Sequence, residues 1–445
     1  MSGLIAKKKS FGKESPWYWI PTLYMAEGLP YFAVNTLTVL MYVKMGLGMA
    51  EMAFATGWLY LPWVIKPFWS PFIDLFSTKR KWILAMQLLI GICLAGIAFF
   101  LPFGNFLTPT LICFWLMAFF SATHDVAADG FYILALTSHE QAAFVGIRST
   151  FYRIASIIGQ GGLVILAGAL ETSTGDIPKS WAIVFLSLSI FFLLITLYHY
   201  YFLPYSDKDI KNETTDSRKI VREFFETFVS FFKKPYILSA LAFMLLYRFP
   251  EALCIKVIQP FLIAPEAEGG LALTTSEVGF VNGTVGVIAL LLGGIAGGLA
   301  IAKGGLKKWL WPMALSLTVP CVFYYILAIW QPGSLSVISI AIFLEQFGYG
   351  FGFSAYMLYL LYFSQGEKST SHYAFCTAFM ALGMMIPGMF AGWIFENVNL
   401  SVLSSQGDNN EFINFFLFVM IACLVTLAVC KIIHIDPEFG KKKEK

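Results

Sequence analysis

Long apolar stretches separated by short polar ones run along the whole chain. Twelve can be distinguished, at about 17–43, 52–75, 82–102, 109–136, 144–170, 181–203, 236–264, 276–302, 309–331, 335–363, 371–396 and 412–435. Each is about 20 residues or longer, enough for an α-helix to cross a ~30 Å hydrocarbon core. Because the runs are continuously apolar and do not alternate, they favour helices over a barrel. The pattern predicts an all-α integral membrane protein with twelve transmembrane helices.

Composition excludes a water-soluble globule. Of the 445 residues, 58% are hydrophobic and only 13% are charged, whereas a typical soluble domain carries about 25% charged residues. The seven cysteines lie in apolar runs without metal-ligand spacing, so we expect small hydrophobic side chains and no bound metal. The first run contains Glu27 and Pro30 and lacks a small-residue cleavage site, so we interpret it as a span, not a signal peptide.

The basic residues predict the orientation of the chain. Among the loops opposite the two termini, only Lys44 and Lys179 are basic, whereas the loops on the side of the termini are rich in Lys and Arg. By the positive-inside rule, both termini are expected in the cytoplasm. These charges flank spans and form no patch with aromatic platforms, so we expect membrane lipid and no nucleic acid as a partner.

One long charged segment divides the apolar runs into six plus six. The predicted domains are an N-terminal six-helix bundle (1–203), a cytoplasmic linker (204–235) and a C-terminal six-helix bundle (236–445). The halves also correspond in their charges, since Glu27 in span 1 is matched by Glu251 in span 7 and Asp125 in span 4 by Glu345 in span 10. Duplicated six-helix halves are typical of secondary transporters.

Charged groups inside the spans are concentrated in spans 1, 4, 7 and 10. Each costs about 2.5–3.5 kcal/mol to insert and therefore requires a function or a partner. They are Glu27, His124, Asp125, Asp129, Arg248, Glu251, Lys256 and Glu345, with Lys66, Asp74, Arg148 and Arg153 in spans 2 and 5. Helical spacing adds Tyr31 in span 1 and Tyr349 and Tyr356 in span 10 to these polar faces. Four such faces predict a shared aqueous cavity, although the same tyrosines would also suit interfacial belts.

The acidic residues are candidates for proton coupling. Burial of an unpaired carboxylate favours its protonated form, which a proton-coupled carrier requires. Asp125 and Glu27 are the first candidates, followed by Asp129 and Glu345. Asp129 and Arg153 lie at similar depths in neighbouring antiparallel spans, so a structural charge pair between them is the alternative for that residue.

The basic residues of span 7 are candidates for substrate binding. Arg248, and with it Lys256, would meet a negative charge on the substrate, and Glu251 would belong to the same site. Arg248 and Glu251 share a helical face, so a self-neutralised pair is equally compatible with the spacing. His124 is either a substrate contact or a hydrogen-bonded core residue.

Catalytic and cofactor motifs are missing from the sequence. The glycine-rich segment 348–352 lies within a span and follows no strand, so it does not suit a nucleotide loop. There is no Walker motif, HExxH or nucleophile elbow. We therefore expect neither an enzyme nor a cofactor.

Several segments together resemble a known family. They are 66–74 (KPFWSPFID) with the basic turn 79–81, 121–129 (SATHDVAAD), Tyr152-Arg153, Leu246-Tyr247-Arg248, 260–263 and Gly28-Leu-Pro30. The combination resembles the muropeptide permease (AmpG) and acetyl-CoA transporter group of the major facilitator superfamily. Within it, we expect Asp74, Lys79 and Arg80 to form a gating motif. The chain departs from the group's pattern at His124, where Gln is usual, at Gly130-Phe131, and at Glu27 before Gly-Leu-Pro.

The resemblance implies two pseudo-symmetric six-helix bundles, alternating access and proton-driven import of anhydro-muropeptides. Asp125, Asp129 and Arg153 would be its functional charges in helices 4 and 5. We therefore expect a proton symporter, monomeric and multi-pass in a bacterial inner membrane, that imports a sugar–peptide bearing a carboxylate. Transport of another organic anion, such as a CoA ester or siderophore, and export are the alternatives. A transporter-like sensor or scaffold without turnover is the alternative from another class.

Overall fold

The computed structural model is helical throughout its described part, which comprises residues 15–70, 73–206, 209, 217–366, 368–400 and 410–439. Within helices, the side chains of residues 74–75, 138, 142–143, 145 and 217–221 are outside that part. The predicted all-α membrane fold is confirmed. The side chain of Asp74, one of the predicted gating residues, is not among those described.

The elements up to residue 203 are η1 (Pro16–Tyr18), α1 (Ile20–Phe32), η2 (Ala33–Leu37), α2 (Thr38–Lys44), α3 (Met49–Gly57), η3 (Trp58–Tyr60), α4 (Leu61–Trp69), α5 (Ile73–Phe76), α6 (Lys79–Phe100), α7 (Leu107–Ala135), α8 (Ser138–Ile157), η5 (Ile158–Gly162), α9 (Leu163–Thr174) and α10 (Ile177–Phe202). We call them the first half. Two of them, η2 and η5, are π-helical turns within longer helices.

The later elements are α11 (Ser217–Phe232), α12 (Ile237–Leu246), α13 (Phe249–Ile263), η6 (Glu266–Glu268), α14 (Thr275–Val278), η7 (Gly279–Gly286), α15 (Val287–Gly304), α16 (Leu306–Thr318), η8 (Val319–Cys321), α17 (Val322–Trp330), α18 (Leu335–Ser364), α19 (Ser369–Asn397) and α20 (Glu411–Ile432). From α12 onward they form the second half. It also contains a π-helical segment, η7.

Ten helices in the described ranges are long and apolar enough to cross a membrane, and they match the ten predicted runs from 82–102 onward. The other two predicted spans, 17–43 and 52–75, are also helical, as α1–η2–α2 and α3–η3–α4, but they are not among the ten. Polar residues and prolines explain the difference. Glu27 and Asn35 lower the apolar character of the first, and α4 contains Pro62 and Pro67.

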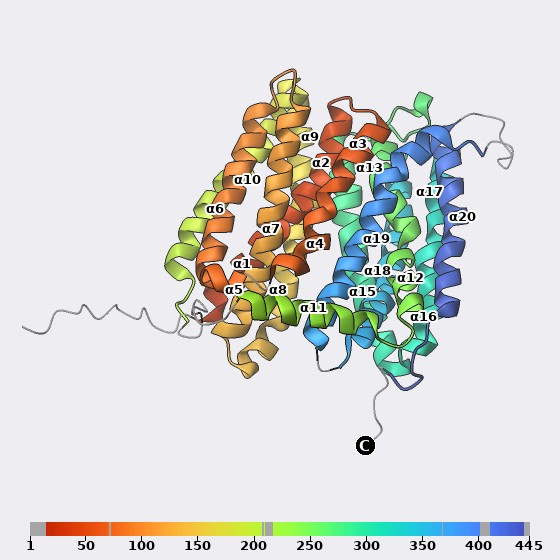
Figure 1. Cartoon of the computed structure of the whole chain (residues 1–445). Helices are drawn as coiled ribbons and strands as arrows, with labels where there is room; N and C mark the ends of the chain where they lie inside the picture. The colour runs from red at the N-terminus through yellow and green to blue at the C-terminus, as the bar shows by residue number, and fades with distance from the viewer. Residues whose placement is uncertain are drawn as a thin grey trace, which may run out of the picture.

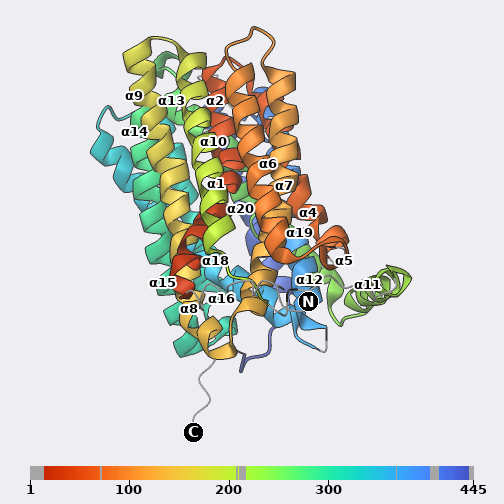
Figure 2. The ribbon, with the colours of Figure 1, turned by 90° about the vertical axis from the view of Figure 1, so that its left-hand side faces the viewer.

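The two halves stand side by side as roughly parallel helical stacks (Figure 1), with the red-to-yellow helices on one side and the green-to-blue ones on the other. Helix α1 begins and α20 ends at the lower end in this view, which we call the termini end; the opposite end is the far end. Helix α11 lies across the termini end and extends beyond the stack in the rotated view (Figure 2). The exact bounds predicted for the bundles and the linker stay a prediction.

Helix α11 is fixed to the second half by its end. The Lys234 ammonium donates to the carbonyl oxygens of Phe363 (2.5 Å) and Gln365 (2.6 Å), at the end of α18. Burial lowers the pKa of this lysine. Ser230 of α11 also hydrogen-bonds His372 of α19 at 2.9 Å. The C-terminal end of α11 is therefore held against the second half.

The two most extensive contacts between the halves are α3 and α4 against α19, and η5 and α9 against η7 and α14; α2 also touches α13. Glycines make both contacts possible. A Cβ on Gly283 would lie 1.9 Å from the carbonyl oxygen of Gln160, and one on Gly392 would lie 2.2 Å from that of Met49. Neither position has room for a larger side chain. Of the two glycines, Gly392 lies near the end of α19 and meets the start of α3, so this contact closes the far end.

Candidate functional site: a cavity between the halves

A cavity of about 520 Å³ lies between the halves and takes its lining from both. This volume is within the usual range of small-molecule sites, roughly 300–1,000 Å³. Its polar lining residues are Tyr24, Glu27, Tyr31, Asn35, Thr36, Tyr60, Arg148, Ser149, Tyr152, Arg153, Ser156, Gln160, Arg248, Glu251, Gln259, Asn282, Glu345, Gln346 and Tyr349. The structure thus brings together six predicted site residues from spans 1, 7 and 10, namely Glu27, Tyr31, Arg248, Glu251, Glu345 and Tyr349.

One charge cluster lies on the first half. Lys66 of α4 forms an ion pair with Asp125 of α7. Glu27 of α1 lies beside Asp125, close enough for their carboxylates to interact directly. Its Oε2 atom is buried and has no hydrogen-bond partner in the described part of the chain. Two adjacent carboxylates cannot both be ionised cheaply, so Lys66 neutralises Asp125 and leaves Glu27 as the carboxylate without a cation of its own.

Asp129 is paired differently from the prediction. Its Oδ1 atom lies 2.9 Å from an Arg148 nitrogen and accepts a hydrogen bond from the Tyr24 hydroxyl at 3.1 Å. The Arg148 guanidinium also lies over the Tyr24 ring, 4.6 Å from its centre. The predicted pair of Asp129 with Arg153 is therefore corrected. Arg153 lies five residues after Arg148 on α8, which is more than one full turn, so its side chain points in another direction. Arg153 lines the cavity.

A second charge cluster lies on the second half. Arg248 binds both carboxylate oxygens of Glu251, through Nε at 2.7 Å and a terminal nitrogen at 2.5 Å. The same terminal nitrogen donates to the Tyr349 hydroxyl at 2.8 Å, and the Phe353 ring lies 4.9 Å from the guanidinium carbon. Such two-pronged pairs are geometrically fixed. The cluster presents an oriented guanidinium in the cavity wall.

Glu345 sits in a polar pocket of its own. Its Oε2 atom accepts hydrogen bonds from the Tyr324 hydroxyl and from the Gln346 amide, each at 2.8 Å. The side chain is buried and has no salt bridge within the described residues. It is therefore a hydrogen-bonded buried carboxyl group at the cavity wall.

Three predicted substrate-binding residues lie away from the cavity lining. His124 is buried beside Gln87, with 3.0 Å between their nitrogens. Tyr356 donates to the Met244 carbonyl at 2.5 Å and stacks on Tyr247. Lys256 lies between the halves, where its ammonium donates to Thr56 at 2.9 Å. Their predicted contact with substrate therefore has no support in this arrangement.

Two of the predicted gating residues, Lys79 and Arg80, bind the end of α10 and the segment that follows it. Asp209 accepts hydrogen bonds from the backbone nitrogens of Lys79 at 2.7 Å and Arg80 at 2.9 Å, and so caps the start of α6. The Arg80 side chain donates to the carbonyls of Tyr200 (2.5 Å) and Leu203 (3.0 Å). Arg80 thus satisfies the end of α10, and the gating role stays a prediction.

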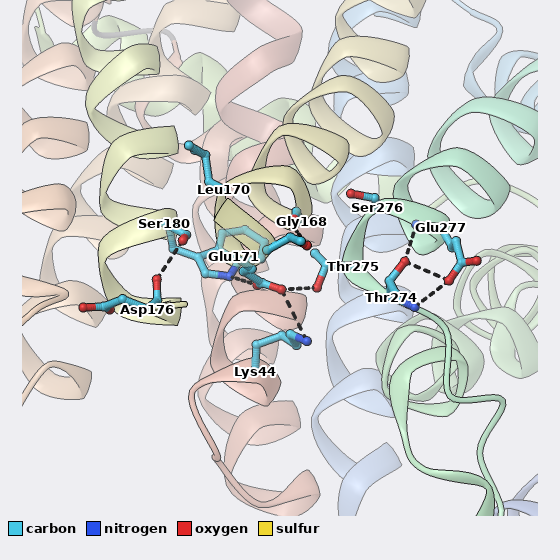
Figure 3. A network of polar contacts seen from close by, with 12 residues as sticks. Lys44, Gly168, Leu170, Glu171, Asp176, Ser180, Thr274, Thr275, Ser276 and Glu277 are labelled. Carbon is cyan, nitrogen blue, oxygen red and sulfur yellow. Dashed lines mark hydrogen bonds and ion pairs between the residues drawn. The ribbon is translucent and has the colours of Figure 1, made fainter. Parts of the chain in front are cut away.

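A polar network at the far end joins the halves (Figure 3). Glu171 of α9 accepts hydrogen bonds from the Trp181 indole at 2.8 Å and from the Thr275 hydroxyl at 2.6 Å. The Lys44 ammonium lies 3.4 Å from the same carboxylate. Only Thr275 belongs to the second half, and Ser276 beside it donates to the Ile165 carbonyl at 3.1 Å.

The sequence predictions overlooked the partners and the uncharged polar groups. The sequence shows Lys66 and Arg148 as cations inside spans, but it does not show that they pair with Asp125 and Asp129. The pattern of charges also does not single out the five carboxamides of the cavity, Asn35, Gln160, Gln259, Asn282 and Gln346. Their presence inside apolar runs, where amides are costly, was the available indication.

A match to a family model identifies the protein family. The model of the Major Facilitator Superfamily matches residues 20–359. This chain belongs to the major facilitator superfamily. It is accordingly a multi-pass membrane transporter of small molecules and not an enzyme.

Curated relatives support the resemblance to the AmpG group. The anhydromuropeptide permease of Escherichia coli K12 is 26% identical over 381 residues, which are 83% of this chain and 70% of that protein. The putative transporter AmpG 4 of Rickettsia conorii is 24% identical over 421 residues, 92% of this chain and 94% of that one. The resemblance to the group is confirmed at this level of identity.

Solved structures show the same fold at lower identity. An inward-facing, unoccupied bacterial homologue of the human lysosomal transporter Spinster superposes with a TM-score of 0.69 and 14% identity, covering 95% of this chain and 98% of its own. A D-xylose–proton symporter gives 0.66 and 13%, covering 93% and 95%. The major facilitator fold predicted for the chain is therefore confirmed.

Proposed function

We propose that this protein imports a carboxylate-bearing sugar–peptide of the muropeptide class, coupled to protons, by alternating access of its two halves. The observation that carries the proposal is the cavity between the halves, which combines an oriented guanidinium with a buried carboxyl group, that of Glu27, that forms no ion pair within the described residues. The permease named among the relatives supports the substrate class.

The orientation follows from charge. The Lys- and Arg-rich loops lie at the termini end, so the proposal places both termini in the cytoplasm and the far end outside. The bacterial relatives support an inner membrane. Each half contributes to the cavity within a single chain, so a monomer is sufficient for transport.

Substrate carboxylates would be met by two arginines of the cavity. Arg248 already holds Glu251 in a two-pronged bond and would exchange part of it for the substrate. Arg153 lines the cavity and has no carboxylate partner in the described part of the chain. Arginine suits this task because its planar fork matches a carboxylate.

The proton would bind at Glu27. Asp125 beside it is neutralised by Lys66, whereas the Oε2 atom of Glu27 meets no donor among the described residues. A proton on Glu27 would relieve the repulsion between the two carboxylates. Loading the proton and the substrate into one cavity couples their movement across the membrane.

Uptake into proteoliposomes tests the proposal. The probe is labelled N-acetylglucosaminyl-anhydro-N-acetylmuramic acid, with and without its peptide, under an imposed inward proton gradient. We expect uptake that collapses with a protonophore. No uptake of either probe, in vesicles shown to contain folded protein, would remove muropeptides as the substrate, and a screen of other organic anions would follow.

A further inference from the structure

Carboxamides gather at one end of the cavity. Asn35 lies in η2, Gln160 in η5 and Asn282 in η7, so each belongs to a different span. The three segments touch, because η2 contacts η5 and η5 contacts η7. Gln259 of α13 lines the same cavity. We call these four residues the carboxamide cap.

The backbone at the cap is unusual in all three spans. The segments η2, η5 and η7 are π-helical, although the helices on either side of them are regular. A π-helical turn inserts an extra residue, redirects the side chains of that turn, and occurs frequently at functional sites. Three of them in contact at one end of one cavity indicate that the side chains there are positioned for a purpose.

Two oxygen atoms of the cap lack a donor. The Oδ1 atom of Asn35 and the Oε1 atom of Gln259 are buried and accept no hydrogen bond from the described residues. The side chains are only 3% and 5% exposed. The Asn35 amide is oriented unambiguously, since its nitrogen donates to the Tyr31 carbonyl at 2.9 Å. Buried acceptors without a donor are rare and costly, so the site is built to receive a hydrogen-bond donor.

The chemistry of that donor follows from the residues present. A carboxylate only accepts hydrogen bonds and would leave both oxygens unsatisfied, whereas hydroxyl and amide N–H groups donate. The four cap residues are uncharged, so they offer no partner for an ion. The Gln160 amide, whose nitrogen donates to Ser156 at 2.8 Å, adds a further oxygen near the Thr36 hydroxyl at 3.4 Å.

We propose that the carboxamide cap binds a neutral part of the solute that carries hydroxyl or amide N–H groups, such as an N-acetylated sugar. The inference rests on the proposed function and deepens it. The solute lies in the cavity with its sugar at the cap and its carboxylates at Arg153 and Arg248. The cap selects for the sugar, and the arginines select for the acidic peptide.

Binding measurements on purified full-length protein test this orientation. The probes are the disaccharide–peptide named above and the free peptide. The variants are Asn35→Leu and Gln259→Met, which nearly keep the size of the side chain and remove its amide group. Asn397→Leu is the matched control, because Asn397 also donates to the carbonyl four residues earlier, at 3.0 Å, but is exposed and outside the cavity.

We expect each cap variant to weaken binding of the disaccharide–peptide about tenfold and to leave that of the free peptide within about twofold, a loss of the size expected for one hydrogen bond. The control binds both probes normally. Unchanged affinity for the disaccharide–peptide in folded cap variants overturns the inference and leaves the proposed function standing. Equal loss for both probes also overturns it. Failure of the wild-type protein to bind the disaccharide–peptide overturns the proposed function, and the inference with it.

Discussion

Glu171 and Thr275 connect the two halves of the transporter by one hydrogen bond of 2.6 Å at the far end. Thr275 is 1% exposed, so the bond is shielded from water. Glu171 is anchored on its own side by Trp181. When the halves separate at this end, as alternating access requires, this bond to an ionised group must break.

The first prediction concerns this bond. Thr275→Val keeps the shape of the side chain and removes its hydroxyl, so the closed far end loses roughly 1.5–3 kcal/mol, the usual worth of a hydrogen bond to a charged group. We expect the equilibrium to shift about 10- to 100-fold towards an open far end. The measurement is the labelling rate of Asn282→Cys by a membrane-impermeant maleimide, in a background without other cysteines.

Thr172→Val is the control for this experiment, because the Thr172 hydroxyl donates at 3.0 Å to the Gly168 carbonyl of its own helix. The Thr172→Val variant should be labelled at the same rate as the parent protein, which carries Asn282→Cys alone. Equal labelling rates for Thr275→Val and Thr172→Val would show that the Glu171 bond does not hold the far end closed.

The second prediction concerns the backbone contact below that bond. Gly283→Ala places a Cβ 1.9 Å from the Gln160 carbonyl oxygen, whereas a Cβ on Gly162 has nothing within 4 Å. We expect Gly283→Ala to cost about 1–3 kcal/mol of stability through overpacking and to lower uptake at least tenfold. Gly162→Ala should behave like wild type. Thermal unfolding in detergent together with uptake distinguishes them, and normal uptake by Gly283→Ala would contradict the contact.

Much of the fold was predictable because the bilayer constrains it. Ten runs from 82–102 onward became continuous helices, since an apolar stretch of that length has no other way to satisfy its backbone in lipid. The first two spans are less apolar, because the first carries Glu27 and Asn35 at the cavity and the second carries Pro62 and Pro67. The π-helical turns at Asn35 and Gln160 left no mark in the hydrophobic pattern.

The site was predictable only as a set of charges. Matching depths in the sequence pointed to Arg153 as the partner of Asp129, whereas the pair is formed with Arg148, because the choice also depends on the rotation of α8 about its axis. For the same reason, the sequence does not show whether His124 faces the cavity or the core. The role of Glu171 was not foreseen, since it lies at a span end where an acidic residue needs no explanation.

The third prediction follows from the place of His124. Gln is usual here in the AmpG group, and His124 contacts Gln87 at 3.0 Å in the core, not the cavity. His124→Gln should therefore keep substrate affinity within about twofold and change stability by less than about 1.5 kcal/mol. Gln87→Leu, which removes the partner of both His124 and His199, should cost about 1–3 kcal/mol for each group left unsatisfied. A large loss of affinity in His124→Gln would return this residue to the substrate site.

The fourth prediction concerns the arginine fork. Arg248→Lys keeps the charge but cannot bind Glu251 through two parallel bonds while also donating to Tyr349. We expect the affinity for a carboxylate-bearing solute to fall about 10- to 100-fold, roughly 1.4–2.8 kcal/mol. Arg222→Lys is the control, since Arg222 pairs with Glu226 on the exposed helix α11. Unchanged affinity in Arg248→Lys would indicate a purely structural pair.

The last prediction separates the two adjacent carboxylates of the first half. Asp125→Asn leaves the half-buried Lys66 without its partner, and breaking a buried ion pair typically costs about 3–5 kcal/mol, which is the upper limit for this pair. Its effect should therefore appear as lost stability, and Lys66→Met in the same chain should restore much of it. An Asp125→Asn variant whose uptake keeps its full pH dependence would rule Asp125 out as the proton site.

Glu27→Gln should behave in the opposite way, because Glu27 has no cation to leave behind. We expect nearly unchanged unfolding temperature, because a neutral amide cannot repel Asp125. Uptake by the wild-type protein should rise as the outside pH falls, because in the proposed mechanism a proton from outside must bind Glu27 before it is carried inward. Glu27→Gln should lose this rise while keeping counterflow, which needs no net proton movement. Glu51→Gln, an exposed carboxylate of α3, is the control, and a pH profile in Glu27→Gln that matches it would place the proton elsewhere.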